Sequence, residues 1–127
     1  MKIKILALSA IMASVFYSCY YDVEQELYPT NSTSCDTSNI TYSVTIKGIL
    51  LNNACMGCHN QTVFASSGGN VNLDGYSNVK SYIDNGKLLS SIVQDGKASF
   101  MPKGGAKMGA CSLLKVQTWI NAGAPNN

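Results

Sequence analysis

The chain of 127 residues contains no arginine and only one histidine. Its nine lysines are spread along the sequence, so there is no basic stripe of the kind that binds nucleic acid, and we expect no nucleic-acid partner. No apolar run reaches the roughly 20 residues that a membrane-spanning helix needs. No segment of useful length alternates apolar and polar residues, which argues against strands and favours an all-α fold.

The first residues have the pattern of an export signal. Two lysines precede an apolar run of 13 residues, 5–17, and Ser18 and Cys19 follow this run. A small residue before cysteine resembles the cleavage site of bacterial lipoproteins, although Phe16 stands where leucine is usual. We therefore predict that residues 1–18 are a lipoprotein signal peptide and that Cys19 carries the lipid. Ordinary signal cleavage near the same place is the alternative.

This start predicts an exported protein, lipid-anchored to a bacterial membrane on its periplasmic side or at the cell surface. Without residues 1–18 the chain has seven lysines and seven acidic residues, so its net charge falls from +2 to zero. A neutral chain predicts weak electrostatic steering toward redox partners. The polar composition that follows predicts an acylated cysteine and tether over residues 19–39 and a single domain over residues 40–127.

Residues 55–59 read Cys-Met-Gly-Cys-His and include the chain's only histidine. This C-x-x-C-H pattern predicts covalent attachment of haem c, because two thiols at this spacing reach both vinyl groups of the porphyrin. Cys55 and Cys58 would form the thioether bonds, and His59 would bind the iron. A thiol-redox pair or a zinc site is an alternative. The chain lacks the βαβ pattern of thioredoxin-like folds, and a zinc site would need a further ligand from Cys35 or Cys111.

The second axial ligand of such an iron is predicted by elimination among the five methionines. Met1 and Met12 belong to the expected signal peptide, and Met56 lies within the haem motif. Met101 precedes a proline on a glycine-containing loop, which holds the backbone extended and lets a thioether point inward. Met108 comes just before the last predicted helix, where an apolar residue commonly packs against the start of that helix as a hydrophobic staple. We therefore prefer Met101 as the ligand and keep Met108 as the alternative.

The remaining cysteines, Cys35 and Cys111, are left over once lipid and haem are assigned. An exported protein occupies a compartment in which disulfides persist. We therefore expect a Cys35–Cys111 disulfide, with two unpaired buried thiols as the alternative.

Apolar periodicity predicts four short helices joined by long loops. They are expected over residues 43–53, 77–85, 87–95 and 110–122, with loops over 60–72 and 97–109. Ser43 is the predicted N-cap of the first helix. We expect Trp119, the only tryptophan, to pack against the haem-bearing helix or the haem edge. Gly48 indicates either a close helix crossing or a glycine that the helix merely tolerates.

Three segments together resemble a known family: the motif at 55–59, Met101-Pro102 with Gly104-Gly105, and Trp-Ile-Asn-Ala-Gly-Ala-Pro at 119–125. They are similar to the small monohaem cytochrome c domain of class I type, in the form common in lipoproteins of Bacteroidota and in planctomycete-type cytochromes. The resemblance covers about residues 40–127. It implies an all-α cytochrome c-like fold of about four short helices wrapped around one covalently attached haem, with the first and last helices crossing.

The resemblance also implies a function. Axial ligation by His59 and Met101 fills both faces of the iron, so the expected protein is a membrane-anchored electron carrier between exported or membrane redox partners, and not itself an enzyme. The alternative function is a haem-based sensor or a small peroxidase whose distal ligand is labile.

Overall fold

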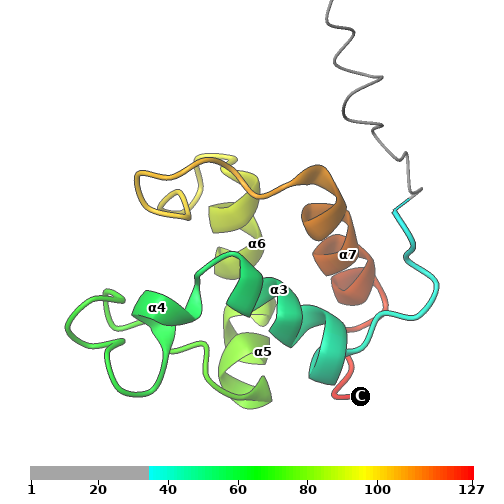
Figure 1. Cartoon of the computed structure of the whole chain (residues 1–127), viewed down its shortest axis with the longest axis horizontal. Helices are drawn as coiled ribbons and strands as arrows, with labels where there is room; N and C mark the ends of the chain where they lie inside the picture. The colour runs from blue at the N-terminus through cyan, green and yellow to red at the C-terminus, as the bar shows by residue number, and fades with distance from the viewer. Residues whose placement is uncertain (1–34) are drawn as a thin grey trace, which may run out of the picture. The chain divides into compact units, whose positions relative to one another are not determined.

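The computed structural model describes residues 35–127 (Figure 1). The expected signal peptide, the expected lipidation site Cys19 and most of the expected tether lie outside these residues. Within them every regular element is helical and no strand is present, which agrees with the predicted all-α class. No helix in this part of the chain is long and apolar enough to cross a membrane.

The first helical segment begins with a π-helical turn, η1 (Tyr42–Ile46), and continues directly into α3 (Lys47–Asn52). Its N-cap is Thr41, so the prediction of Ser43 was wrong. Thr41 has the extended backbone that a cap requires, and its hydroxyl accepts a hydrogen bond from the Val44 N–H at 3.4 Å. The Ser43 N–H is bonded instead to the carbonyl of Asn127 at 2.9 Å.

The other helices lie close to their predicted positions. They are α4 (Met56–His59), α5 (Tyr76–Asp84), α6 (Lys87–Val93) and α7 (Ala110–Asn121). Only α4, a single turn inside the cysteine motif, was not foreseen as a helix. α6 ends two residues before the predicted Asp95, because Gln94 adopts a left-handed backbone (φ 58°). The carboxylate of Asp95 then accepts hydrogen bonds from the Ser90 hydroxyl and the Lys97 N–H.

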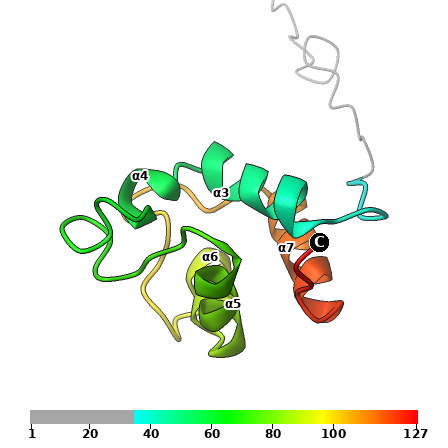
Figure 2. The same ribbon diagram turned by 90° about the horizontal axis from the view of Figure 1, so that it is seen from below.

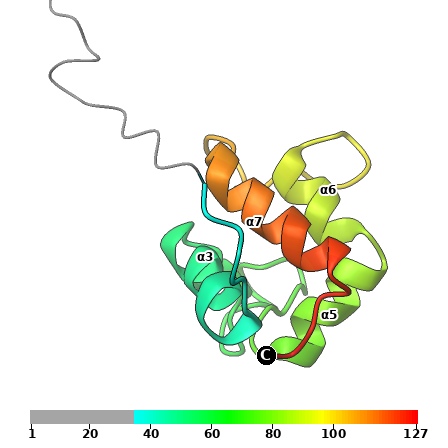
Figure 3. The same ribbon diagram turned by 90° about the vertical axis from the view of Figure 1, so that its right-hand side faces the viewer.

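The core forms where three helices meet. The Trp119 ring of α7 is only 1% exposed and stacks on Tyr42 of η1, with centroids 5.9 Å apart and planes inclined by 28°. Tyr76 of α5 meets Tyr42 edge-on at 5.1 Å. Trp119 therefore packs against the first helix. The prediction that it packs against the helix of the haem motif was wrong. Figure 3 shows α7 between α3 on one side and α5 and α6 on the other.

Residues 124–127 fasten these helices together by hydrogen bonds. Trp119 Nε1 and the Tyr76 hydroxyl donate to carbonyls of this segment at 3.0 and 2.8 Å. The Asn127 side chain accepts the Tyr42 N–H at 2.9 Å. An N–H group at the start of a helix has no partner within its own helix, and Asn127 accepts two such groups of η1, those of Tyr42 and Ser43.

Gly48 has open space around it, since a Cβ added there would meet no atom within 4 Å. The glycine therefore does not serve a close helix crossing. It is tolerated in α3, where it is half-buried.

The sulfurs of Cys35 and Cys111 lie 2.05 Å apart, at disulfide distance, with their Cα atoms 5.4 Å apart. This is the pairing that the cysteine count predicted. The bridge joins the beginning of the described chain to the first turn of α7 across 76 positions of sequence.

Replacing both Cys35 and Cys111 by serine should lower the free energy of unfolding by about 4 kcal/mol. The disulfide closes a long loop and so restricts the unfolded chain, by an amount that grows with loop length. Urea unfolding of wild type and double variant measures the difference, with reduced wild-type protein as the matched control. Equal stabilities would show that the pair contributes nothing.

Candidate functional site

The cysteine motif lies on the short helix α4. Cys55 stands at its N-cap with helical backbone angles, φ −59° and ψ −40°, and Cys58 follows three positions later. Residues three apart on a helix share a face, so the two thiols lie on the same side of this turn. Neither forms a disulfide; Cys58 is exposed and Cys55 is half-buried. The turn therefore offers two free thiols side by side, followed at once by a histidine.

The imidazole of His59 is held in one orientation by the loop that follows it. Its Nδ1 lies 2.9 Å from the carbonyl oxygen of Val71, and the ring is 9% exposed. A carbonyl only accepts hydrogen bonds, so Nδ1 carries the proton in this contact and Nε2 keeps its lone pair.

Within residues 35–127 no protein group bonds to Nε2 of His59, and every fully buried side-chain nitrogen or oxygen there has a partner. Nε2 is therefore not sealed inside the protein. It is the nitrogen available to a metal.

Loop 60–72 is irregular, as predicted, but it is tied down by its own hydrogen bonds. The Asn60 side chain accepts the N–H groups of Thr62 and Val63 at 2.7 and 3.1 Å and donates to the Met56 carbonyl at 2.7 Å. The Leu73 N–H returns to the His59 carbonyl at 2.7 Å. The loop thus leaves α4 and comes back to it, which brings the carbonyl of Val71 within hydrogen-bond distance of the imidazole.

Gly68 is where this loop touches the motif most closely. A Cβ at this position would lie 2.3 Å from the Cys58 carbonyl oxygen and 3.0 Å from Nδ1 of His59. No side chain fits, so the close approach requires glycine. The sequence analysis missed Gly68. The glycine pair in a stretch without helical period was the signal that could have indicated it.

The two thiols differ in their surroundings. Burial raises the pKa of the Cys55 thiol, only partly opposed by a backbone hydrogen bond, so this group stays protonated at neutral pH. The further ligands that a zinc site would take, Cys35 and Cys111, lie at disulfide distance from each other. Among the described residues no three His, Cys, Asp or Glu side chains cluster closely enough to hold a metal ion by themselves.

The two candidate methionines lie in different environments. Met108 is 6% exposed and belongs to the hydrophobic core, as its predicted role as a packing residue requires. Met101 is half-buried in loop 97–109, whose backbone is held by α6. Its N–H bonds the Ser91 carbonyl at 3.0 Å, and its carbonyl accepts from Gln94 at 3.2 Å.

The structure thus brings the thiols and the imidazole together on α4 and places Met101 on loop 97–109, where α6 holds its backbone. Figures 1 and 2 show α4 at the end of the molecule away from the C-terminal end of α7. Loop 97–109, drawn yellow to orange, reaches toward that same end in both views.

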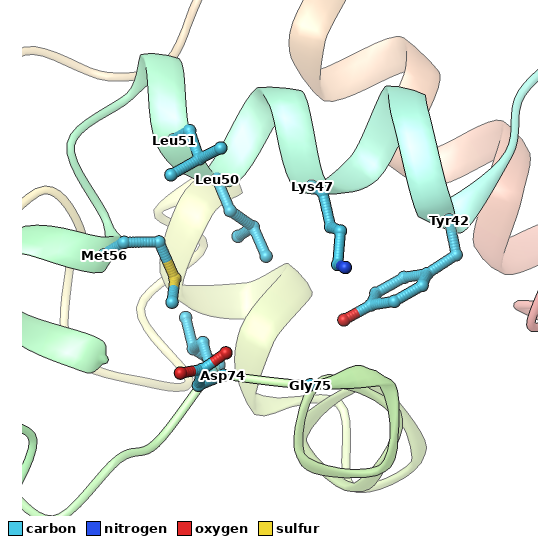
Figure 4. Close-up of a pocket in the computed structure, with 8 residues that line it drawn as sticks. Tyr42, Lys47, Leu50, Leu51, Met56, Asp74 and Gly75 are labelled. Carbon is cyan, nitrogen blue, oxygen red and sulfur yellow. The ribbon is translucent and has the colours of Figure 1, made fainter. Parts of the chain in front are cut away.

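A pocket of about 200 Å³ lies on another side of the motif, between α3, α4 and the start of α5 (Figure 4). Met56 points into it, but neither cysteine of the motif nor His59 lines it. Its volume is below the roughly 300–1,000 Å³ of pockets that enclose a drug-sized ligand. Because Met56 is the only residue of the motif that lines it, the pocket is distinct from the candidate site. Burial, with a smaller contribution from Asp74, raises the pKa of Tyr42 at the edge of the pocket.

Comparisons with protein-family models, with curated proteins and with solved structures find no match. The chemistry of the site is accordingly argued from its own residues.

Substituting Gly68→Ala should lower the free energy of unfolding by roughly 1–3 kcal/mol, because the new methyl group overpacks a site that has no room for it. The same change should also displace the loop and disturb the His59 imidazole. Urea unfolding measures the first effect, and the NMR signals of the imidazole ring report the second.

Gly48→Ala is the matched control, since nothing lies within 4 Å of its added Cβ. It should raise the stability by about 0.5–1 kcal/mol, the usual gain of alanine over glycine in a helix. If Gly68→Ala behaved like this control, the close packing of the loop on the motif would be disproved.

Proposed function

We propose that this protein is a membrane-anchored c-type cytochrome that carries single electrons between exported or membrane redox partners. Haem c would be attached through Cys55 and Cys58, with His59 and Met101 as axial ligands. One observation carries the proposal: His59 directly follows two free thiols on one helical turn, and its Nδ1 is bound while its Nε2 is open. The donor set and its arrangement fit this cofactor.

The hydrogen bond from Nδ1 to the Val71 carbonyl prepares the histidine for this role. It selects the tautomer that presents Nε2 as a ligand, and it prevents the ring from rotating away. Gly68 supports the arrangement, because its lack of a side chain lets the loop approach the ring.

Cys55 and Cys58 would supply the covalent attachment. In each thioether the sulfur bonds one carbon of a vinyl group and the thiol hydrogen goes to the other, so no external oxidant or reductant is consumed. The exposure of Cys58 and the protonated state of Cys55 are compatible with this addition. Two covalent bonds from one helical turn would fix the orientation of the group relative to His59.

Haem c bound here would supply an iron that alternates between ferric and ferrous states and so accepts and donates one electron at a time. Met101 is the better candidate for the second axial ligand, since its side chain is half-buried on a loop whereas Met108 is committed to the core. A thioether ligand favours the ferrous state relative to a second imidazole and raises the reduction potential.

Attachment to a membrane through Cys19 belongs to the same proposal. The cysteine pair at disulfide distance supports export, because disulfides persist in oxidising compartments. The redox partners would then be proteins that meet the cytochrome at the membrane or in the exported space.

The test of attachment is the mass of the mature protein, produced in a host with a cytochrome c assembly pathway. We expect the denatured chain to retain the mass of one haem, because thioether bonds survive unfolding. The Cys55→Ser/Cys58→Ser variant should lose it. A colourless wild-type protein from such a host would refute the proposed function.

Met101→Ala should convert a low-spin spectrum with a methionine–iron charge-transfer band into a high-spin spectrum that binds carbon monoxide. Met108→Ala is the matched control: it should keep the low-spin spectrum but lose about 2–5 kcal/mol of stability, the usual cost of truncating a core methionine. Optical spectra of both variants decide between the two ligands. A wild-type protein that is already high-spin and binds carbon monoxide would favour the sensor or peroxidase alternative.

A further inference from the structure

The backbone of Met101 is held by the helix that precedes its loop. Its N–H donates to the Ser91 carbonyl at 3.0 Å, and its carbonyl accepts a hydrogen bond from Nε2 of Gln94 at 3.2 Å. Both backbone polar groups of Met101 are therefore bonded to the C-terminal end of α6. These bonds use only the backbone, so they fix where Met101 lies without engaging its thioether.

Gln94, which supplies the second of these bonds, has an unusual backbone for a residue with a side chain. It is the C-cap of α6 and adopts a left-handed conformation, φ 58° and ψ 47°. At a helix end glycine usually takes this conformation, because it has no Cβ to clash. The residues with positive φ that follow α5 and α7 are indeed glycines, Gly86 and Gly123. Only at the end of α6, among these three helices, does a glutamine stand in that place.

The side chain of Gln94 does what a glycine could not do. Its amide reaches the Met101 carbonyl across seven positions of sequence, and a carbonyl accepts hydrogen bonds only from a donor such as this NH₂ group. The next residue, Asp95, accepts hydrogen bonds from the Ser90 hydroxyl and from the Lys97 N–H, the latter at 3.0 Å. Asp95 thus holds the start of the segment that leaves α6, and Gln94 holds Met101 where this segment returns.

From these contacts we propose that Gln94 is a positioning residue for the second axial ligand. It keeps the backbone of Met101 at α6 and so holds the thioether at a high effective concentration near the iron. Without this bond the segment would gain conformational freedom, and a larger fraction of molecules would have the methionine detached. The inference rests on the proposed function, because it gives Gln94 a role toward haem c attached at the motif.

The test begins with Gln94→Gly in the mature, haem-loaded protein. Glycine adopts the left-handed backbone without strain, and this relief offsets the lost hydrogen bond, so the urea midpoint should stay close to that of wild type. The methionine should nevertheless detach more often. Carbon monoxide binds only molecules with a detached methionine, so its apparent affinity for the ferrous protein should rise about fivefold, the factor that corresponds to one lost hydrogen bond. The methionine–iron charge-transfer band of the oxidised protein should weaken as well.

Gln94→Glu keeps the length of the side chain and replaces its donor by a carboxylate. Two acceptors would then face each other at the Met101 carbonyl, so the affinity for carbon monoxide should rise further than in Gln94→Gly. Gln117→Glu is the matched control, because the amide of Gln117 also donates a hydrogen bond, at 2.9 Å, but to the Asn121 side chain within α7. This control should keep the wild-type spectrum and affinity.

Hydrogen exchange of the Met101 amide reports on the anchoring of the backbone itself. We expect faster exchange in Gln94→Gly than in wild type. Faster exchange with an unchanged affinity for carbon monoxide would show that Gln94 supports only the loop, and would overturn the proposal. Equal behaviour of Gln94→Gly and Gln117→Glu would overturn it too.

Failure of the proposed function would be seen in the wild-type protein alone. Absence of covalent haem, read from the mass, or absence of the methionine–iron band would refute the His59 and Met101 ligation, and the role of Gln94 with it. A wild type that has both, together with Gln94 variants that behave like the control, would refute the role of Gln94 alone.

Discussion

The contact between Nδ1 of His59 and the carbonyl of Val71 is the interaction on which the candidate site depends. It fixes a ring that would otherwise rotate, and it leaves one nitrogen free for a ligand role. The contact exists only because loop 60–72 returns to α4, and the loop can return so closely only because Gly68 has no side chain. Gly68, which has no side chain to react or bind, therefore decides how the imidazole of His59 is held.

Contacts away from the site join the helices of the domain. The aromatic contact of Tyr42 with Trp119 joins the first and last helices, and residues 124–127 cap η1 and bind α5 and α7 at once. The cysteine pair adds a link at the other end of α7. The thiols of the motif form no disulfide; Cys58 is exposed, whereas Cys55 is half-buried and packs against the core.

The charge of the described domain is distributed unevenly. Loop 97–109 carries three exposed lysines and reaches toward the end where α4 lies, whereas the described chain begins at the other end, beside the start of α7. The total charge of the sequence hid this feature, because acidic residues outside the domain balance the lysines within it.

The sequence by itself determined the helical class, the positions of four helices to within about two residues, the cysteine pairing and the residues of the C-x-x-C-H motif, because each follows from local periodicity, spacing or counting. It did not reveal the Thr41 cap, the packing partner of Trp119 or the need for glycine at position 68. Each of these depends on segments far apart in sequence that meet only in the folded chain: the C-terminal segment occupies the Ser43 N–H, Trp119 meets η1, and loop 60–72 folds back on α4. Tertiary structure decided them because sterics and hydrogen bonding across such contacts leave no periodic trace in the sequence.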